Sequence, residues 1–425
     1  MSKISILLAA LALTACSARA LLSEDVVRSE MTRNPEASYI DGLEGKLKWN
    51  YTTGLELQSF LDAAIAGTKA PEGIASDCST KASEAAVPSK GIGPYELTFE
   101  GTANGGAVLR YVDAWYDAII DSTGRIGVNY KKSNYSLDHI CPGRTLFTLY
   151  DLTGKEKYRL AMDSLFVQLR EQPRTKEGGF WHKKIYPDQM WLDGLYMAQP
   201  FYAEYTARYA PDSLKQECFA DIQRQFELSW AGCYDPSTRL LRHAWDSSRS
   251  MFWCDPSTGQ SAHAWGRACG WYAMALVETI PWLPRPEVLT GMLNNLMHTV
   301  MDYADPQTGM WYQVLDRPGE EGNYVESTAS AMFTYALLKG IRNGWIKDIP
   351  METVREKYRS LLRTFVSYDP STGLVNLERC CEVAGLGGKE NRSGTYDYYL
   401  NEKIRSNDPK GIGPLVWAAL EYEKL

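Results

Sequence analysis

The stretch DPQTGMW, residues 305–311, closes a long run of apolar residues that are spaced as in a helix. Its form recurs as DPSTRLL from residue 235 and as DPSTGLV from residue 369, at intervals of 70 and 64 residues. Proline cannot continue a helix, and glycine accepts the positive φ angle of a tight turn, so each copy marks a reversal of the chain. The intervals leave room for a pair of antiparallel helices between successive turns.

The segments between these turns place apolar residues three and four positions apart, the pattern of helices with one buried face. Strand-like alternation is scarce. The helical segments are 107–120, 157–172, 213–230, 271–280, 286–304, 326–341 and 351–368. Repeated helix pairs predict an all-α fold, an (α/α)6 barrel of six hairpins. A similar turn, DSTGRIG, begins at residue 121, and the shorter segment DPSTGQS from 255 breaks the period, so the repeat is not strict.

We expect three parts along the chain. Residues 1–20 read as an export signal, residues 21–100 as a lead-in with the first barrel helix, and residues 101–425 as the barrel that carries the site. A polar stretch rich in Gly, Ser and Pro lies near 71–94, and no interdomain linker follows residue 95.

The first twenty residues, MSKISILLAALALTACSARA, have a short basic start, an apolar run and small residues at the end. This is the pattern of a secretory signal, and the run is too short to span a membrane. LTAC, ending at Cys16, resembles the bacterial lipobox, in which the cysteine is lipidated; cleavage after Ala20 is the alternative. Either way we expect an exported protein, periplasmic or anchored to a bacterial membrane through a lipid at Cys16.

Composition and charge narrow the range of functions that this protein could have. The net charge is −7 and no Lys/Arg run is present, which argues against a nucleic-acid partner. The chain has 26 Tyr and 13 Trp, many beside Gly, Asp or His, which suits the stacking of sugar rings or simply the filling of a large core. The eight cysteines after Cys16 show neither CxxC nor disulfide spacing and are expected as buried thiols, although one disulfide stays open.

Four polar and aromatic clusters precede helical segments, and together they hold four of the five histidines. They are YSLDHICPGR (135–144), GGFWHKKIYPDQMWLDG (178–194), RHAWD (242–246) and SAHAWGRACGWY (261–272). HExxH, CxxC, GxSxG and phosphate-loop patterns are absent from the sequence, so no metal site, serine nucleophile or phosphate cradle is predicted. Acid–base chemistry by carboxylates remains.

Asp193 and Asp138 are the natural pair for such chemistry. We read YPDQMWLDGLYMA (186–198) as the start of a helix with Pro187 in its first turn, and Asp193 then lies among methionines and aromatics. Such burial is expected to raise the pKa of Asp193, so that it could act as general acid and then as base. The alternatives are a salt bridge of Asp193 to Lys183 or an arginine, and a helix cap or a pairing with Arg144 for Asp138.

Arg267 stands between Trp265 and Trp271. A guanidinium can bind a carboxylate with two hydrogen bonds while the indoles form a stacking wall, which would suit an acidic sugar. The alternative is a buried ion pair of Arg267 with Glu278 or Asp193.

With these residues the chain resembles glycoside hydrolase family 105, the unsaturated rhamnogalacturonyl hydrolases. The resemblance covers roughly residues 105–422 and includes GGFWHKKIYPDQMWLDGLYMAQPF, RHAWD, WGRACGWYAMALVE, ESTASAMF, GTYDYYL and KGIGPL. It implies an (α/α)6 barrel without metal or organic cofactor. It also implies a substrate whose non-reducing end is a 4,5-unsaturated uronic acid. The acid protonates C4 of the enol ether, water adds at C5, and the hemiketal opens to expel the rest of the oligosaccharide.

By this resemblance Asp193 is the acid that protonates C4, and Asp138 is the second carboxylate, which orients the sugar or supports the proton transfer. The positions that match substrate contacts are His182, Lys183, Trp191, His243, Trp265, Arg267 and Trp271. Two positions depart from the pattern: His139 where Asn or Asp is more usual, and Asp188 where His or Asn is.

Three other functions remain open. An unsaturated glucuronyl hydrolase would act on glycosaminoglycan-type fragments with the same barrel and chemistry. The motif YPDQMWLDGLYM favours rhamnogalacturonan as the substrate. An inverting glycosidase would use Asp138 and Asp193 on an ordinary glycosidic bond. A lipid-anchored glycan-binding protein would have no use for a carboxylate at Asp193.

Overall fold

The computed structural model describes residues 21–67 and 105–425. The expected signal at 1–20, the lipidation at Cys16, and the polar stretch near 71–94 lie outside the described residues. Within the described ranges, no helix has the length and hydropathy that a membrane crossing requires.

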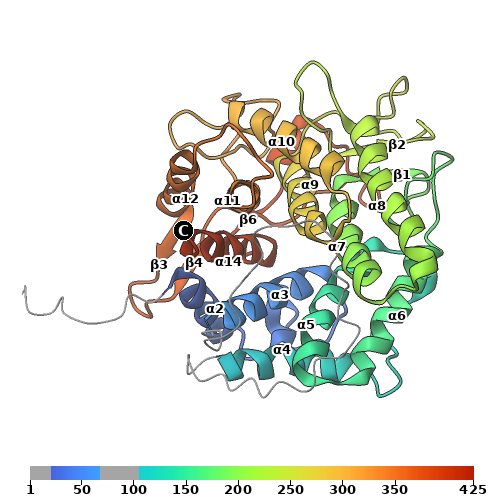
Figure 1. Ribbon diagram of the computed structural model, residues 1–425. Coiled ribbons are helices and arrows are strands. Elements are labelled where there is room, and N and C mark those ends of the chain that lie inside the picture. Colours follow the sequence, from blue (N-terminus) through green and yellow to red (C-terminus); the bar gives the residue numbers. More distant parts are fainter. Residues whose placement is uncertain (1–20, 68–104) are drawn as a thin grey trace, which may run out of the picture.

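The described chain forms two concentric rings of helices, which confirms the predicted (α/α)6 barrel (Figure 1). The inner helices are α3 (Tyr51–Ala66), α5 (Thr145–Thr153), α7 (Leu192–Tyr209), α9 (Gly266–Thr279), α11 (Ser327–Arg342) and α14 (Pro409–Glu423). The outer helices are α2 (Leu22–Arg33), α4 (Gly105–Ile119), α6 (Glu156–Arg170), α8 (Asp212–Cys233), α10 (Glu287–Asp302) and α12 (Met351–Phe365). Each inner helix packs against its neighbours in the ring, and α14 closes it on α3.

Burial separates the two rings. The inner helices α9 and α11 are buried over almost their whole length, while the outer α12 buries only one face. The inner helices pack on both sides and so are apolar nearly all round, whereas the outer helices are amphipathic. The helical periodicity in the sequence came mostly from the outer ring.

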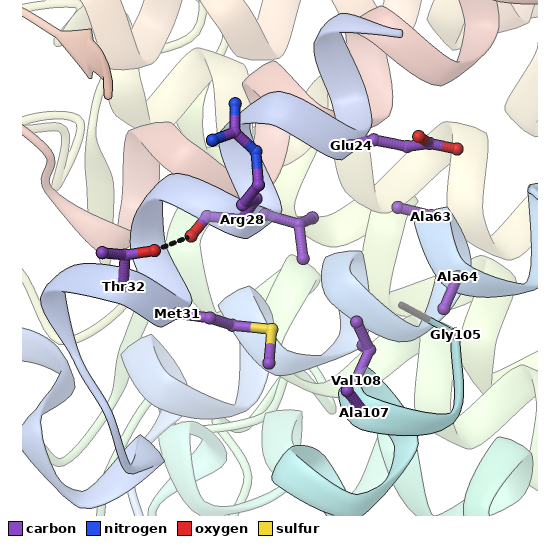
Figure 2. Close-up of a pocket in the computed structure, with 10 residues that line it drawn as sticks. Glu24, Arg28, Met31, Thr32, Ala63, Ala64, Gly105, Ala107 and Val108 are labelled. Atoms are coloured by element: carbon purple, nitrogen blue, oxygen red, sulfur yellow. Dashed lines mark hydrogen bonds between the residues drawn. The ribbon is translucent and has the colours of Figure 1, made fainter. Parts of the chain in front are cut away.

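The N- and C-terminal helices of the described chain meet. Figure 1 shows the red α14 beside the blue α2 and α3. The backbone N–H and the hydroxyl of Ser23 donate to the carboxylate of Glu423 at 3.1 and 2.7 Å. Where α2, α3 and α4 come together, a groove of about 190 Å³ is lined mainly by apolar side chains, with Glu24 and Arg28 among the exceptions (Figure 2).

The described strands are short and pair two by two in antiparallel fashion: β1 (Gln189–Trp191) with β2 (Ala244–Asp246), β3 (Val366–Tyr368) with β4 (Val375–Leu377), and β5 (Cys380–Cys381) with β6 (Ile404–Arg405). In the first pair Met190 lies opposite Trp245. The short helices are η1 (Ala37–Gly42), η2 (Lys132–Asn134), η3 (Leu137–His139), η4 (Cys141–Arg144), η5 (Ile280–Trp282) and α13 (Tyr396–Leu400). These small elements lie between the barrel helices and set the positions of the loops.

The expectation that a helix begins near Pro187 is wrong. Residues 189–191 form β1, and α7 starts at Leu192. Asp188 adopts a φ angle of 60°, which a helix cannot contain, and its carbonyl accepts the N–H of Ser247 at 2.9 Å. This bond joins the turn before β1 to the loop after β2.

The repeated Asp-Pro turns share one construction. In the copy at 305 the Asp305 carboxylate accepts the backbone N–H of Thr308 at 2.7 Å, and the Asp305 carbonyl accepts the N–H of Gly309 at 2.7 Å. Gly309 has a φ angle of 73°. The turns at 121 and 255 also carry a glycine with positive φ, Gly124 and Gly259. At 235 the corresponding position is Arg239, with a φ of 62°.

Gly309→Ala should lower the free energy of unfolding by about 1–2 kcal/mol, because an L-residue is strained in the left-handed region. Space does not limit the change, since the nearest atom to an added Cβ is Lys357 Nζ at 3.5 Å. The reverse substitution, Arg239→Gly, relieves the same strain and should not destabilise. Urea unfolding measures both. Equal losses for the two variants would contradict the assignment of these turns.

Candidate active site

Backbone hydrogen bonds tie together the loops that precede three inner helices. The N–H of Leu137 donates to the carbonyl of His182 at 3.0 Å, and the N–H of His182 donates to Gln189 at 2.9 Å. The N–H of Leu192 donates to His243 at 3.1 Å. Because these loops lead into α5, α7 and α9, their side chains converge at one end of the barrel. Asp138, His182, Lys183, Asp193 and His243 are brought together in this way.

Asp138 is held by a lysine. Its Oδ2 lies 2.5 Å from Lys183 Nζ, and its Oδ1 lies 3.4 Å from His182 Nε2. Burial would raise the pKa of Asp138, but Lys183 and His182 outweigh burial, and the pKa lies below its ordinary value. Asp138 therefore is a fixed carboxylate. It does not pair with Arg144, which binds Glu278 and Tyr196 deeper in the barrel.

Asp193 is the second residue of α7, and its side chain is 14% exposed. Its Oδ2 lies 3.3 Å from His243 Nε2, and neither atom has another partner in the described structure. No ion pair of Asp193 with Lys183 or an arginine is present among the described residues.

The expected rise in the pKa of Asp193 is wrong for the free site. Burial does raise the pKa, but the neighbouring His243, His182 and Arg267 outweigh burial and bring the pKa below its ordinary value. The methionines close in sequence are therefore not the decisive environment. Asp193 is therefore ionised when the site is empty.

Aromatic rings line this end of the barrel. His182 stacks on Trp191 with centroids 4.8 Å apart and an interplanar angle of 7°, and Tyr186 lies parallel to Trp191 at 5.1 Å. Burial lowers the pKa of His182 to about 4, so its ring is neutral. His243 is fully buried, and its Nδ1 lies 2.8 Å from the hydroxyl of Tyr399. The two histidines are thus held between rings, close to the two carboxylates.

Three expected substrate contacts lie deeper. Arg267 is 1% exposed and donates to the backbone carbonyls of Cys381 and Glu382, with its guanidinium 4.6 Å from the ring of Trp265. The alternative, an ion pair of Arg267 with Glu278 or Asp193, is not formed. Trp265 and Trp271 are almost fully buried; Trp271 lies against Tyr51 and Tyr196. Their contact with substrate stays a prediction.

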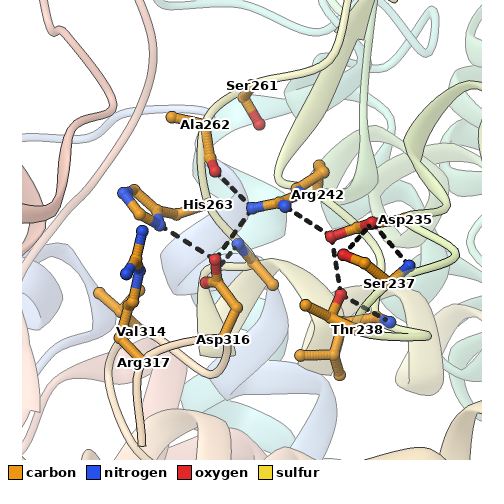
Figure 3. Close-up of polar contacts among 12 residues, drawn as sticks. Asp235, Ser237, Thr238, Arg242, Ser261, Ala262, His263, Val314, Asp316 and Arg317 are labelled. Carbon is orange, nitrogen blue, oxygen red and sulfur yellow. Dashed lines mark hydrogen bonds and ion pairs between the residues drawn. The ribbon is translucent and has the colours of Figure 1, made fainter. Parts of the chain in front are cut away.

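His263 belongs to another network, shown in Figure 3. Its Nδ1 lies 3.0 Å from Asp316, which also binds Arg242 at 2.9 Å, and Arg242 binds Asp235 in the repeated turn. This network ties the loop before α9 to two other loops. His139 lines a cavity next to Asp138, and its Nδ1 is buried without a partner in the described structure.

That cavity has a volume of about 270 Å³ and opens beside Asp138. Its lining includes Lys48, Tyr51 and Lys410, three residues that the sequence reasoning did not select. Tyr399 is a fourth. Tyr399 and Lys410 fall within GTYDYYL and KGIGPL, so the sequence held a signal for them; Tyr51 and Lys48 had none. The described residues include no group of three or more His, Cys, Asp or Glu side chains that could hold a metal ion.

A barrel of helical hairpins with two carboxylates and two buried histidines at one end is the architecture of a six-hairpin glycosidase. Residues 93–425 match the model described as Glycosyl Hydrolase Family 88, and the chain belongs to this family. The solved structure of a Clostridium acetobutylicum glycoside hydrolase from family 105 is 38% identical, with a TM-score of 0.80 over 95% of this chain and 99% of that one. The chain is therefore a glycoside hydrolase of family 105. Membership of this family supports hydrolysis of an unsaturated uronyl group as the activity of this chain.

Two curated relatives are also similar. Protein Atu3128 of Agrobacterium fabrum is 37% identical over 233 residues, which cover 53% of this chain and 97% of that protein. The unsaturated rhamnogalacturonyl hydrolase YesR of Bacillus subtilis is 29% identical over 213 residues, 48% of this chain and 58% of YesR. The unsaturated glucuronyl hydrolase of Bacillus sp. GL1 is 12% identical with a TM-score of 0.63, which indicates a shared fold alone.

Proposed function

We propose that this enzyme removes the 4,5-unsaturated uronic acid from the non-reducing end of rhamnogalacturonan or pectin oligosaccharides by hydrating the vinyl ether. The observation that carries the proposal is the carboxylate of Asp193, whose buried Oδ2 has no partner in the described structure apart from His243 Nε2, 3.3 Å away. A reaction that begins with protonation of carbon and continues with the addition of water needs one well-placed acid and no nucleophilic side chain.

Asp193 gains its proton as the substrate binds. The uronate brings a further negative charge into a site of restricted solvent access, and a nearby like charge raises the pKa of a carboxyl group. Protonated Asp193 gives its proton to C4, and its carboxylate then accepts a proton from the water that adds at C5. The hemiketal formed at C5 opens and releases the remaining sugar.

Asp138 has a different part. Because Lys183 holds it ionised at 2.5 Å, it accepts hydrogen bonds from sugar hydroxyls instead of supplying a proton. The parallel rings of His182, Trp191 and Tyr186 form a wall next to it. The uronic acid ring then lies between this wall and the cavity that contains Lys410.

Two observations favour rhamnogalacturonan over glycosaminoglycan-type fragments. The motif YPDQMWLDGLYM, which contains Trp191 and Asp193, resembles the motif of the rhamnogalacturonan-specific enzymes. The curated relative YesR, at 29% identity, is named for that activity, whereas the unsaturated glucuronyl hydrolase of Bacillus sp. GL1 is 12% identical. The substrate preference thus rests on sequence similarity, and the chemistry rests on the site.

A panel of unsaturated disaccharides tests the proposal. The ultraviolet absorbance of the unsaturated ring should disappear fastest with the rhamnogalacturonan disaccharide and more slowly with chondroitin- and heparin-derived ones. A saturated rhamnogalacturonan disaccharide is the control and should not be cleaved. Cleavage of the saturated sugar would favour the inverting glycosidase, and binding without any turnover would favour a glycan-binding protein.

A further inference from the structure

Tyr399 contacts the site from a part of the chain far from the other site residues. It lies in the short helix α13, is fully buried, and its hydroxyl is 2.8 Å from Nδ1 of His243, 156 residues away in sequence. Its ring is stacked near Trp265, with centroids 6.0 Å apart, and its carbonyl accepts a hydrogen bond from Gln313. The Tyr399 hydroxyl takes part in none of the proton transfers of the proposed reaction.

The contact bears on where the proton of His243 lies. A neutral imidazole has one N–H, on Nδ1 or on Nε2, and the partner of one nitrogen selects the form. Nε2 of His243 lies 3.3 Å from Oδ2 of Asp193. If the proton were on Nδ1, the Nε2 lone pair would face an ionised carboxylate, and the two would repel. A hydroxyl that donates to Nδ1 removes this conflict.

We propose that Tyr399 is a positioning residue: its hydroxyl donates to Nδ1 of His243 and so holds the imidazole proton on Nε2, directed at Asp193. This inference rests on the proposed role of Asp193 as the acid. Burial raises the pKa of Tyr399 well above its ordinary value, so the phenol keeps the proton that it donates. The Nε2–H then fixes the rotamer of Asp193 and stabilises its carboxylate after C4 has been protonated.

Other groups also act on Asp193, and their contribution must be held constant. The titratable and charged groups whose charges reach it are His182, His243, Arg267, Lys183, Tyr51, Cys269 and Tyr399. Removing the Tyr399 hydroxyl leaves the other side chains in place. Nδ1 of His243 then lacks its donor, so the imidazole is no longer held in one tautomer. Asp193 loses a hydrogen-bond donor, which raises the pKa of Asp193.

Nitrogen-15 NMR of the full chain measures the tautomer directly, and only five histidines need to be assigned. His243 should carry its proton on Nε2 in the wild type and shift toward the Nδ1 form in Tyr399→Phe. In kinetics, Tyr399→Phe should lower kcat by about tenfold or more. The part of the kcat–pH profile that falls with rising pH should move to higher pH, because the acid Asp193 then loses its proton at a higher pH.

Tyr398→Phe is the matched control. Tyr398 is the preceding residue in α13, and its hydroxyl accepts the N–H of Gly385 at 3.0 Å without contacting His243. It should leave the tautomer and the kcat–pH profile unchanged. A wild-type His243 with its proton on Nδ1, or a Tyr399→Phe variant with unchanged tautomer and kcat–pH profile, overturns the inference. Failure of the wild type to consume any unsaturated uronyl substrate would overturn the proposed function instead, because the NMR result stands without turnover.

Discussion

Asp193→Asn should lower kcat on an unsaturated rhamnogalacturonan disaccharide by about 100- to 10,000-fold, the usual contribution of a general acid. Asparagine keeps the shape of the side chain but cannot supply a proton to C4. The carboxamide still fits beside His243, so the fold and substrate binding should persist. Loss of the ultraviolet absorbance of the unsaturated ring measures turnover, and calorimetric titration with the disaccharide measures binding.

The matched control is Asp188→Asn, the same change five positions earlier. Asp188 lies in the turn before β1 with a φ angle of 60°, a conformation that asparagine tolerates well, and it has no contact with Asp193. Its turnover should equal that of the wild type. If Asp193→Asn consumed the unsaturated disaccharide at the full rate, the assignment of Asp193 as the acid would be wrong.

Glu278→Gln should lower the free energy of unfolding by about 3–5 kcal/mol, the range for removing one partner of a buried ion pair. Glu278 accepts from Arg144 at 2.7 Å and from Lys339 at 2.8 Å, and the hydroxyl of Tyr335 donates to the same carboxylate. These residues come from α9, α11 and the turn that leads into α5. Without the carboxylate, two cations remain buried with no negative partner in this network.

The pH dependence of Glu278 follows from the same geometry. Burial would raise its pKa, but Lys339 and Arg144 outweigh burial and lower the pKa from 4.5 to about 2. Its contribution to stability is present above the ordinary value and is lost as the pH falls toward 2. The wild type should therefore lose stability faster than Glu278→Gln between pH 4.5 and 2. Urea unfolding at several pH values measures both slopes.

Glu356→Gln provides the surface comparison. Glu356 is about half exposed and pairs with Arg359 and Arg363 on the outer helix α12. Exposed pairs of this kind contribute under about 1 kcal/mol. A loss for Glu278→Gln as small as that for Glu356→Gln would contradict the view that the buried network joins the inner helices.

The sequence predicted the ring of helical hairpins because helix period and turn chemistry act over a few residues. Apolar spacing marked the outer helices, and Asp-Pro followed by Gly309 or Gly373 marked the reversals. It also selected the loops that meet at the site, since Asp138, His182, Asp193 and His243 all lie in those clusters. The start of α7 was misplaced because the φ of Asp188 and the pairing of β1 with β2 depend on a distant strand.

The pairing of side chains was decided by the tertiary structure alone. Lys183 binds Asp138, Arg144 binds Glu278, and Arg267 binds backbone carbonyls instead of a carboxylate. The neighbours of Asp193 in sequence predicted a raised pKa, but His182 and His243, brought by other loops, lower it. Local patterns determine which residues enter a helix or a turn. Charges and hydrogen bonds act between residues that are far apart in sequence. The protonation of Asp193 and the role of Tyr399 therefore depend on the closed ring of helices.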